Sequence, residues 1–149
     1  MMNDLDKFDL AIIRELEKNA RISVTELACI VGLSKTPCKI RMDRLENQGY
    51  ILGYSILVDK AKLGESHVAF VQVTLSDTKT KALEAFNKAI KLVPQVEQCH
   101  MIAANFDYLL KVRTADMDSY RKFLGETLSN LPFVMQSSTF VVMEDVKDR

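Results

Sequence analysis

An internal repeat in the second half of the chain constrains its fold more than any other feature. Residues 67–75 read as a strand, which is followed by a helical pattern, Pro94 and a second strand. The same order returns from residue 108, with a strand, a helix, Pro132 and a last strand that ends near residue 143. This βαββαβ order is typical of the ferredoxin-like fold. We therefore expect a four-stranded antiparallel sheet with two helices on one face.

The apolar patterns of this half indicate which surfaces are covered. The second helix is expected to face the sheet with apolar residues spaced three or four apart: Met117, Tyr120, Leu124, Leu128 and Leu131. Residues 68–73 are apolar at nearly every position, which in an antiparallel sheet indicates that both faces are buried. A second copy of the chain is the expected cover, so we predict a homodimer. The alternative is that the hinge and wing of the same chain shield this strand.

Residues 1–58 carry helical patterns in place of this repeat. Ser23 is expected to cap a helix, with Glu26 completing a capping box, and Gly32 to end that helix after about two turns. Ser34 is then expected to cap the next helix. Two helices joined by so tight a turn have the proportions of a helix-turn-helix. An ordinary helical hairpin is the alternative.

The third helix separates apolar from basic residues. Cys38, Met42 and Leu45 lie on one face and are expected to point inward. Basic residues dominate the rest of the helix, which favours contact with DNA, although a basic helix face is often only solvated. We expect Lys35 and Arg44 to contact phosphates and Thr36, Lys39, Ile40 and Asp43 to contact base edges. The full set of expected DNA-binding residues is Ser34, Lys35, Thr36, Pro37, Lys39, Ile40, Arg41, Asp43 and Arg44.

Two short segments complete the expected domain plan. Residues 50–58 can form a small two-stranded wing behind the third helix. Residues 59–65 are polar and contain a glycine, which suits a hinge. The predicted fold class is therefore α+β, with a winged helix-turn-helix over residues 1–58, a hinge over residues 59–65 and a ferredoxin-like domain that forms the dimer over residues 66–149.

Charge and hydropathy limit the partners. The chain carries 20 Lys and Arg residues against 20 Asp and Glu residues, so DNA binding requires local clustering of charge and several copies of the chain. The sequence begins MMNDLDKFD, unlike a secretory signal, and contains no apolar run near the roughly 20 residues that a membrane-spanning helix needs. We expect no membrane partner and a cytoplasmic, nucleoid-associated location.

The residues that could support catalysis or metal binding are few. Cys99 and His100 are neighbours on one strand and point to opposite faces, so they form no nucleophile–base pair. Cys29 and Cys38 are far apart in sequence, and no pair has metal-ligand spacing. We therefore expect neither an enzyme nor a metal site.

Four segments carry a resemblance to a known family: LDKFD at 5–9, LSKTPC at 33–38, RLENQGYI at 44–51 and NFDYLL at 105–110. With them, the chain resembles the leucine-responsive regulator (Lrp/AsnC) family of transcription factors along essentially its whole length. FLGETL at 123–128 and VVME at 141–144 look closest to the leucine-responsive branch. Proline-catabolism activators of the same family look similar.

The resemblance implies an assembly and an effector. It implies a homodimer through the C-terminal sheets, dimers that assemble into octamers, and an amino acid such as leucine, or one related to proline, bound between adjacent dimers. No cofactor is implied. The effector residues that it implies are Met101, Ala104, Asn105, Asp107, Met117, Phe140, Val141 and Val142. A carboxylate for the ammonium group and an apolar pocket suit such a ligand. The alternative is that Asp107 caps a hairpin and that the methionines belong to the core.

Two residues depart from the family pattern. Ala104 stands where the family usually has glycine, which disfavours a positive φ and adds a methyl group near the ligand. Phe140 lacks the hydroxyl of the usual aromatic residue. The resemblance as a whole implies a sequence-specific transcriptional regulator that responds to an amino acid. The alternative is an architectural, nucleoid-type DNA-binding protein of the same fold without effector sensing.

Overall fold

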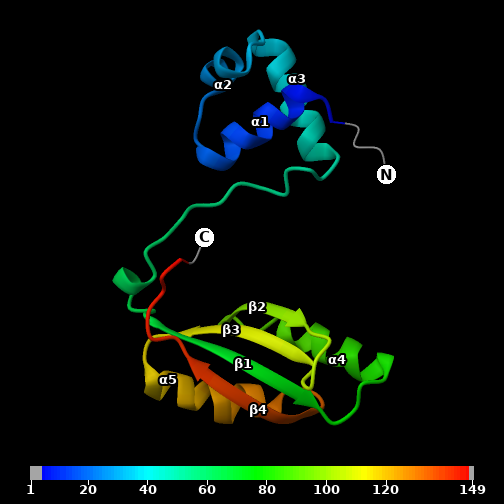
Figure 1. Cartoon of the computed structure of the whole chain (residues 1–149), viewed down its shortest axis with the longest axis vertical. Helices are drawn as coiled ribbons and strands as arrows, with labels where there is room; N and C mark the ends of the chain where they lie inside the picture. The colour runs from blue at the N-terminus through cyan, green and yellow to red at the C-terminus, as the bar shows by residue number, and fades with distance from the viewer. Residues whose placement is uncertain (1–4, 148–149) are drawn as a thin grey trace. The chain divides into compact units, whose positions relative to one another are not determined.

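A computed structural model describes residues 5–147 of the chain and contains two compact units, which divide after Val58 (Figure 1). Residues 1–4 and 148–149, which belong to the predicted domain ranges, lie outside the described residues. Each unit has a hydrophobic core of its own.

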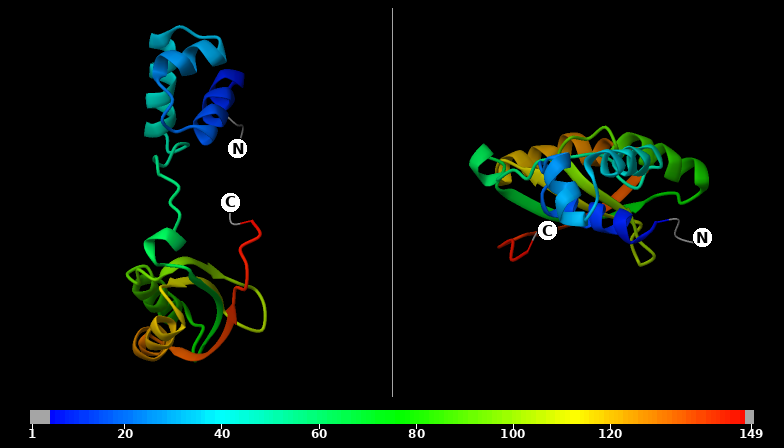
Figure 2. Two further views of the ribbon diagram at one scale, coloured as in Figure 1. Left: turned by 90° about the vertical axis from the view of Figure 1, so that its left-hand side faces the viewer. Right: turned by 90° about the horizontal axis from the view of Figure 1, so that it is seen from above.

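The regular elements described in the N-terminal unit are all helices. They are α1 (Lys7–Lys18), α2 (Val24–Val31) and α3 (Lys35–Asn47), and a short turn joins α2 to α3 (Figures 1 and 2). The core is built from residues that recur at helical spacing on the inner faces: Ile12, Leu16, Leu27, Ala28, Cys38, Met42 and Leu45. The predicted inward face of the third helix is therefore confirmed.

Local capping signals set the ends of these helices. Ser23 and Glu26 form the predicted capping box, and Gly32 has the expected left-handed conformation, with φ +74°. Ser34 occupies the N-cap position of α3, although its side chain makes no capping hydrogen bond to the described residues. Asp6 caps α1 in a second capping box, with Asp9, which the sequence analysis did not predict.

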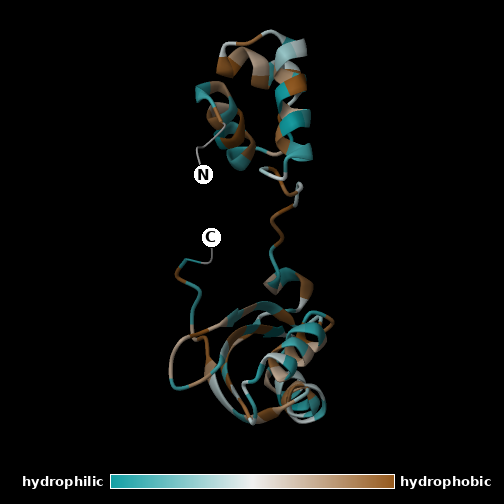
Figure 3. Cartoon of the chain, turned by 90° about the vertical axis from the view of Figure 1, so that its right-hand side faces the viewer, coloured by the Kyte–Doolittle hydropathy of each residue, from teal (hydrophilic) through white to brown (hydrophobic). Residues whose placement is uncertain are grey.

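Residues 50–58 differ from the prediction. All of them are described and none is assigned to a strand, so the expected two-stranded pairing is wrong for this chain. Most of their apolar side chains are in solvent, with Leu52 95% exposed and Ile56 79% exposed, while Ile51 packs against the core of the helices. Figure 3 shows part of this segment in brown. An isolated two-stranded hairpin is at best marginally stable in water, and within the N-terminal unit only Ile51 of this segment packs against the core.

The C-terminal unit has the predicted βαββαβ order. Its elements are β1 (His67–Leu75), α4 (Thr80–Ile90), β2 (Val96–Met101), β3 (Tyr108–Thr114), α5 (Met117–Lys122) and β4 (Val134–Val141). Among the described residues the strands form one four-stranded antiparallel sheet in the order β2-β3-β1-β4. Both helices lie on the same face of the sheet (Figure 2). The predicted fold is confirmed.

Residues 59–65 belong to this unit. A single 3₁₀ turn (Ala61–Leu63) ends at Gly64, which has φ +79°. The carbonyl of Glu65 accepts a hydrogen bond from Arg113 at 3.2 Å, which attaches this segment to β3.

The last helix of the unit is interrupted. After α5 the chain makes a wider π-helical turn (Phe123–Thr127) and then a 3₁₀ turn (Leu128–Asn130). The wider turn lets Phe123 and Leu128, five positions apart, both enter the core. The uninterrupted apolar stripe predicted from Met117 is therefore wrong at its start, because Met117 is exposed.

The face of the sheet opposite the helices is mixed in character. Phe70 of β1 and Phe140 of β4 are directly paired across the strands, and both are exposed in the single chain. The next positions on that face are polar, with Gln72 paired to Ser138. The prediction that both faces of β1 are buried is therefore confirmed for only part of the strand in the single chain: on this face Val68 is buried and Phe70 is exposed.

Candidate DNA-binding and effector sites

The surface of α3 opposite the core is exposed. Lys35, Thr36, Lys39 and Ile40 are exposed, and Ile40 keeps 64% of its surface in solvent. Ser34 and Pro37 are exposed at the start of the helix. An exposed second helix of a helix-turn-helix, with basic and apolar side chains together, has the chemistry needed to read a DNA major groove.

Lys39 and Asp43, one helical turn apart on this surface, form an ion pair. The hydrogen bond and charge of Asp43 raise the pKa of Lys39 above its usual value. Both side chains are about half exposed, so solvent and DNA can compete for the same groups.

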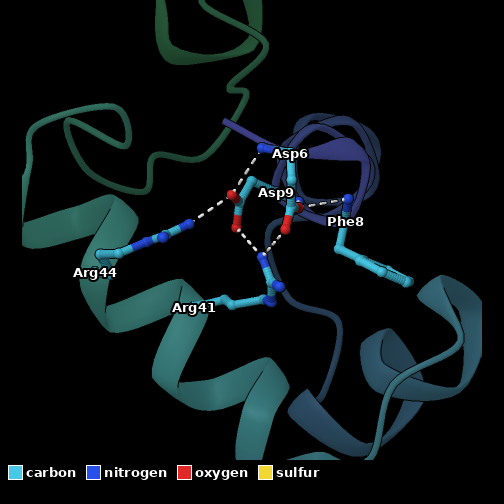
Figure 4. A network of polar contacts seen from close by, with 5 residues as sticks. All are labelled: Asp6, Phe8, Asp9, Arg41 and Arg44. Atoms are coloured by element: carbon cyan, nitrogen blue, oxygen red, sulfur yellow. Dashed lines mark hydrogen bonds and ion pairs between the residues drawn. The ribbon is translucent and has the colours of Figure 1, made fainter. Parts of the chain in front are cut away.

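Asp9 of α1 is bonded to α3 through two arginines, Arg41 and Arg44 (Figure 4). Its side chain is only 1% exposed. It accepts hydrogen bonds from Arg41 Nη1 at 2.8 Å, from Arg44 Nη2 at 2.5 Å and from the backbone N–H of Asp6 at 3.1 Å. Burial raises the pKa of Asp9, but the hydrogen bonds from Arg41, Asp6 and Arg44 outweigh this effect and lower the pKa below its usual value.

The side chains of Arg41 and Arg44 differ in how far they are exposed to solvent. Arg41 is 26% exposed, and its Nη1 also pairs with Asp6 at 2.7 Å, while its guanidinium lies 5.4 Å from the centre of the Phe8 ring. Arg44 is 41% exposed and pairs with Asp9. The sequence analysis missed Asp9 as a functional candidate. The available signal was its spacing, because Asp9 precedes Ile12 and Leu16 on the buried face of α1.

The segment after α3 is bonded to the helix through the backbone N–H groups of Tyr50 and Ile51, which donate to the carbonyl of Leu45, and through the side chain of Tyr54. Tyr54 donates a hydrogen bond to Glu46 Oε1 at 2.7 Å. Burial and the neighbouring Glu46 carboxylate raise the pKa of Tyr54 to about 12, so the hydroxyl keeps its proton.

One group of expected effector residues lies where β2 leads into β3. Met101 ends β2, and Ala104 and Asn105 lie in the connecting loop. Met101 lines a cavity of about 390 Å³ beside Tyr108. Asn105 lines a different, polar cavity of about 210 Å³. These residues are therefore close in the fold but face different spaces.

Asp107 connects this loop to the neighbouring strand. Its Oδ2 accepts a hydrogen bond from the backbone N–H of Leu75 at 2.7 Å, and its own N–H donates to the carbonyl of Val73 at 2.9 Å. The carboxylate thus anchors the loop to β1. Because a carboxylate has several acceptor positions, this contact leaves capacity for a ligand ammonium group.

Ala104 has an ordinary backbone conformation. Among residues 5–147, Phe133 is the only non-glycine residue with positive φ, at 63°. The expected obstacle, an alanine forced into the left-handed region, is therefore not present in this chain.

The other expected effector residues lie toward the opposite end of the sheet. Met117 begins α5, and Phe140 and Val141 end β4, where they pair with Phe70 and Ala69 near the start of β1. Val142 donates its N–H to the carbonyl of Val68. Leu75, which bonds to Asp107, and Val68, which bonds to Val142, are seven strand residues apart, so Asp107 and Val142 are about 20 Å apart along β1. A single chain does not bring them into one pocket.

A further cavity of about 570 Å³ is lined by charged residues of the C-terminal unit, including Lys60, Glu97, Arg113 and Lys122. It contains none of the expected effector residues. Within residues 5–147, no group of three or more His, Cys, Asp or Glu side chains could hold a metal ion. No helix among these residues is long and apolar enough to cross a membrane.

Each of the two units matches a known protein family. Residues 68–149 match the Lrp/AsnC ligand binding domain, and residues 5–51 match a winged helix-turn-helix DNA-binding domain. The chain is 55% identical to the proline dehydrogenase transcriptional activator of Rhizobium radiobacter, over 98% of this chain and 94% of that protein. It is 48% identical to the leucine-responsive regulatory protein of Escherichia coli K12, over 97% and 88% of the two chains.

A solved structure extends the likeness to three dimensions. A transcriptional regulator of Neisseria meningitidis in complex with L-methionine superposes with a TM-score of 0.90 and 30% identity, covering 97% of this chain and 93% of that one. All three relatives are regulators by name, and none is named as an enzyme. The chain belongs to the Lrp/AsnC family of transcriptional regulators, in which a DNA-binding winged helix-turn-helix precedes a ligand-binding domain.

Proposed function

We propose that this protein is a sequence-specific regulator that binds DNA through α3 and responds to a small amino acid. The observation that carries the proposal is the exposed surface of α3, where Lys35, Thr36, Lys39 and Ile40 lie opposite a closed apolar core. Because its proposed partner is double-stranded DNA, we place its action in the cytoplasm, at the nucleoid.

Six residues of α3, and Ser34 before it, have specific proposed roles at the DNA. Lys35 binds a phosphate, with Ser34 and Pro37 at the start of the helix close to the DNA backbone. Lys39 donates to guanine, Asp43 accepts from cytosine N4, and Ile40 lies against a thymine methyl group. The Thr36 hydroxyl can either donate a hydrogen bond to a base edge or accept one from it. These assignments follow from donor and acceptor chemistry and from exposure.

Assembly into homodimers, and of dimers into octamers, compensates for the lack of net charge. The paired Phe70 and Phe140 form an apolar patch on the face of the sheet that no helix covers. We propose that this patch packs against a second copy of the chain. Two recognition helices in one particle then engage two half-sites, and an octamer engages several.

The effector site is proposed to form between copies of the C-terminal unit. Asp107 would bind the ammonium group, and the backbone N–H groups near Ala104 and Asn105 would bind the carboxylate. Met101, Met117, Phe140, Val141 and Val142 would surround an aliphatic side chain. Support comes from the separation of these residues within one chain, since a second copy can bring the missing half of the pocket. Leucine, proline-related compounds and methionine are the candidate effectors, because the names of the relatives include them.

The alternative is an architectural DNA-binding protein without an effector. The ordinary backbone conformation of Ala104 favours the sensing proposal, because it removes one reason to expect that the loop is blocked. A methyl group at this position still adds bulk near the proposed ligand.

One experiment separates the two functions. The binding of the full-length protein to genomic DNA fragments is measured with and without a panel of free amino acids, together with the particle mass. A change in affinity or mass with one amino acid supports the regulator. DNA binding that no amino acid changes, for both the native protein and Ala104→Gly, would leave the architectural function. No DNA binding would overturn both.

A further inference from the structure

We propose that Asp9 is a positioning residue for DNA binding. Its carboxylate holds Arg44 at the flank of α3, where the guanidinium can donate to a phosphate of the DNA backbone. Arg41 is held by Asp6 and Asp9 and does not contact the DNA. The inference rests on the proposed DNA-binding function. It assigns a role to a residue of α1, which lies outside α3, and it gives different roles to Arg41 and Arg44, which were both expected to bind DNA.

The first step is the unusual position of Asp9. A carboxylate with 1% exposure is costly to bury unless charges and hydrogen-bond donors compensate for lost water. Its compensating cations, Arg41 and Arg44, both come from α3. Asp9 therefore connects the interior of the unit directly to the helix that reads DNA (Figure 4).

The second step is the difference between the two arginines. Arg41 bridges two carboxylates, Asp6 and Asp9, and is 26% exposed. Arg44 reaches Asp9 through Nη2 and keeps 41% of its side chain in solvent. A guanidinium has five N–H donors in a rigid plane, so one edge can face Asp9 while another faces a phosphate. Holding the side chain in place before binding reduces the rotamer entropy that complex formation costs.

The third step is that the two possible effects of an Asp9→Asn substitution on DNA affinity have opposite signs, which makes the proposal testable. Replacing Asp9 with Asn removes a negative charge close to the DNA-binding surface, and electrostatics alone would then strengthen DNA binding. Loss of positioning would weaken it. The direction of the change therefore distinguishes the proposed role from a simple charge effect.

The experiment uses the full-length protein and a duplex of random sequence of about 40 base pairs, which can accommodate two half-sites. Dissociation constants are measured across a salt series. We expect Asp9→Asn to weaken binding about three- to tenfold and Arg44→Gln to lower the salt slope by about 0.9 for each protomer in contact. Asp9→Asn in the Arg44→Gln background should have little further effect.

The matched control is Asp6→Asn. It removes a carboxylate from the same network, and asparagine can still cap α1. Because Asp6 pairs with Arg41 and not with Arg44 among the described contacts, the salt slope should not fall. Thermal unfolding of each variant verifies that it is folded at the temperature of measurement.

The outcomes distinguish this inference from the proposed function. If the native protein does not bind the duplex, both fail. If it binds, and Asp9→Asn binds more tightly or Arg44→Gln keeps the native salt slope, only the inference fails. If Asp9→Asn does not fold, the comparison of Arg44→Gln with Arg41→Gln decides: a lower slope for the first alone supports the proposal, and equal slopes overturn it.

Discussion

Lys39 and Asp43 are bonded to each other on the exposed surface of α3, with Lys39 Nζ 2.5 Å from Asp43 Oδ1. Both are proposed to contact base edges. Reading a base must therefore replace this ion pair with contacts to DNA or share its donors with a base. An exposed i,i+4 pair contributes only about 0.3–0.5 kcal/mol to stability, so DNA can break it at small cost.

We expect Lys39→Ala to relax the preference at one base position and to leave the fold intact. A specific Lys–guanine contact contributes about 1–3 kcal/mol of discrimination, whereas the lost surface pair has little effect on unfolding. Competition between DNA sites that differ at single positions measures the change. Lys35→Ala is the matched comparison, since loss of a phosphate contact weakens all sequences about equally. An unchanged sequence preference for Lys39→Ala would show that α3 faces the groove differently.

Asp107 offers a pair of substitutions that separates structure from ligand binding. Asp107→Ala removes the acceptor for the N–H of the buried Leu75 and should destabilise the C-terminal unit by about 1–3 kcal/mol. Asp107→Asn keeps an oxygen acceptor but loses the charge, so near-native stability with no amino-acid response is expected. Thermal unfolding and calorimetry measure the two effects. Native affinity for the effector in Asp107→Asn would exclude the proposed role in binding ammonium.

Phe140 tests the proposed assembly. Its side chain is 53% exposed in the single chain, so Phe140→Asp should change the stability of one protomer little but place a charge in the proposed interface. Light scattering at micromolar concentration should then report particles smaller than the native dimers and octamers. Leu92→Asp is a control, since Leu92 is also an exposed apolar residue but lies at the end of α4. A monomeric native protein would contradict the assembly directly.

Acid should weaken the N-terminal unit through Asp9. The folded-state pKa of Asp9 is lowered, so its contribution to stability is present above the unfolded value near 3.8 and is lost as the pH falls through the lower folded value. Hydrogen exchange of α1 and α3, followed from about pH 5 to about pH 3, should show protection falling in this window. Asp9→Asn should flatten that part of the profile. An equally steep loss of protection in the variant would assign the effect to other carboxylates.

Local signals were sufficient to predict the helix boundaries around the turn of the helix-turn-helix and the topology of the sheet. Ser23, Glu26 and Gly32 act within a few residues of their own positions, so their hydrogen bonds and backbone conformation are encoded nearby. The repeat of strands and helices likewise contains its own periodicity. The order of elements in the C-terminal unit followed from it.

Tertiary structure decided the contacts between distant residues. Asp9 and Arg44 are 35 positions apart, and Asp107 and the N–H of Leu75 are 32 apart, so no local pattern reveals that they are bonded. Whether residues 50–58 pair as strands depended in the same way on what covers their apolar side chains. The sequence by itself determined which residues could cap, turn and pack. Only the fold decided that Arg41 and Arg44 both bond to the buried carboxylate of Asp9, because that depends on how α1 and α3 pack around a shared core.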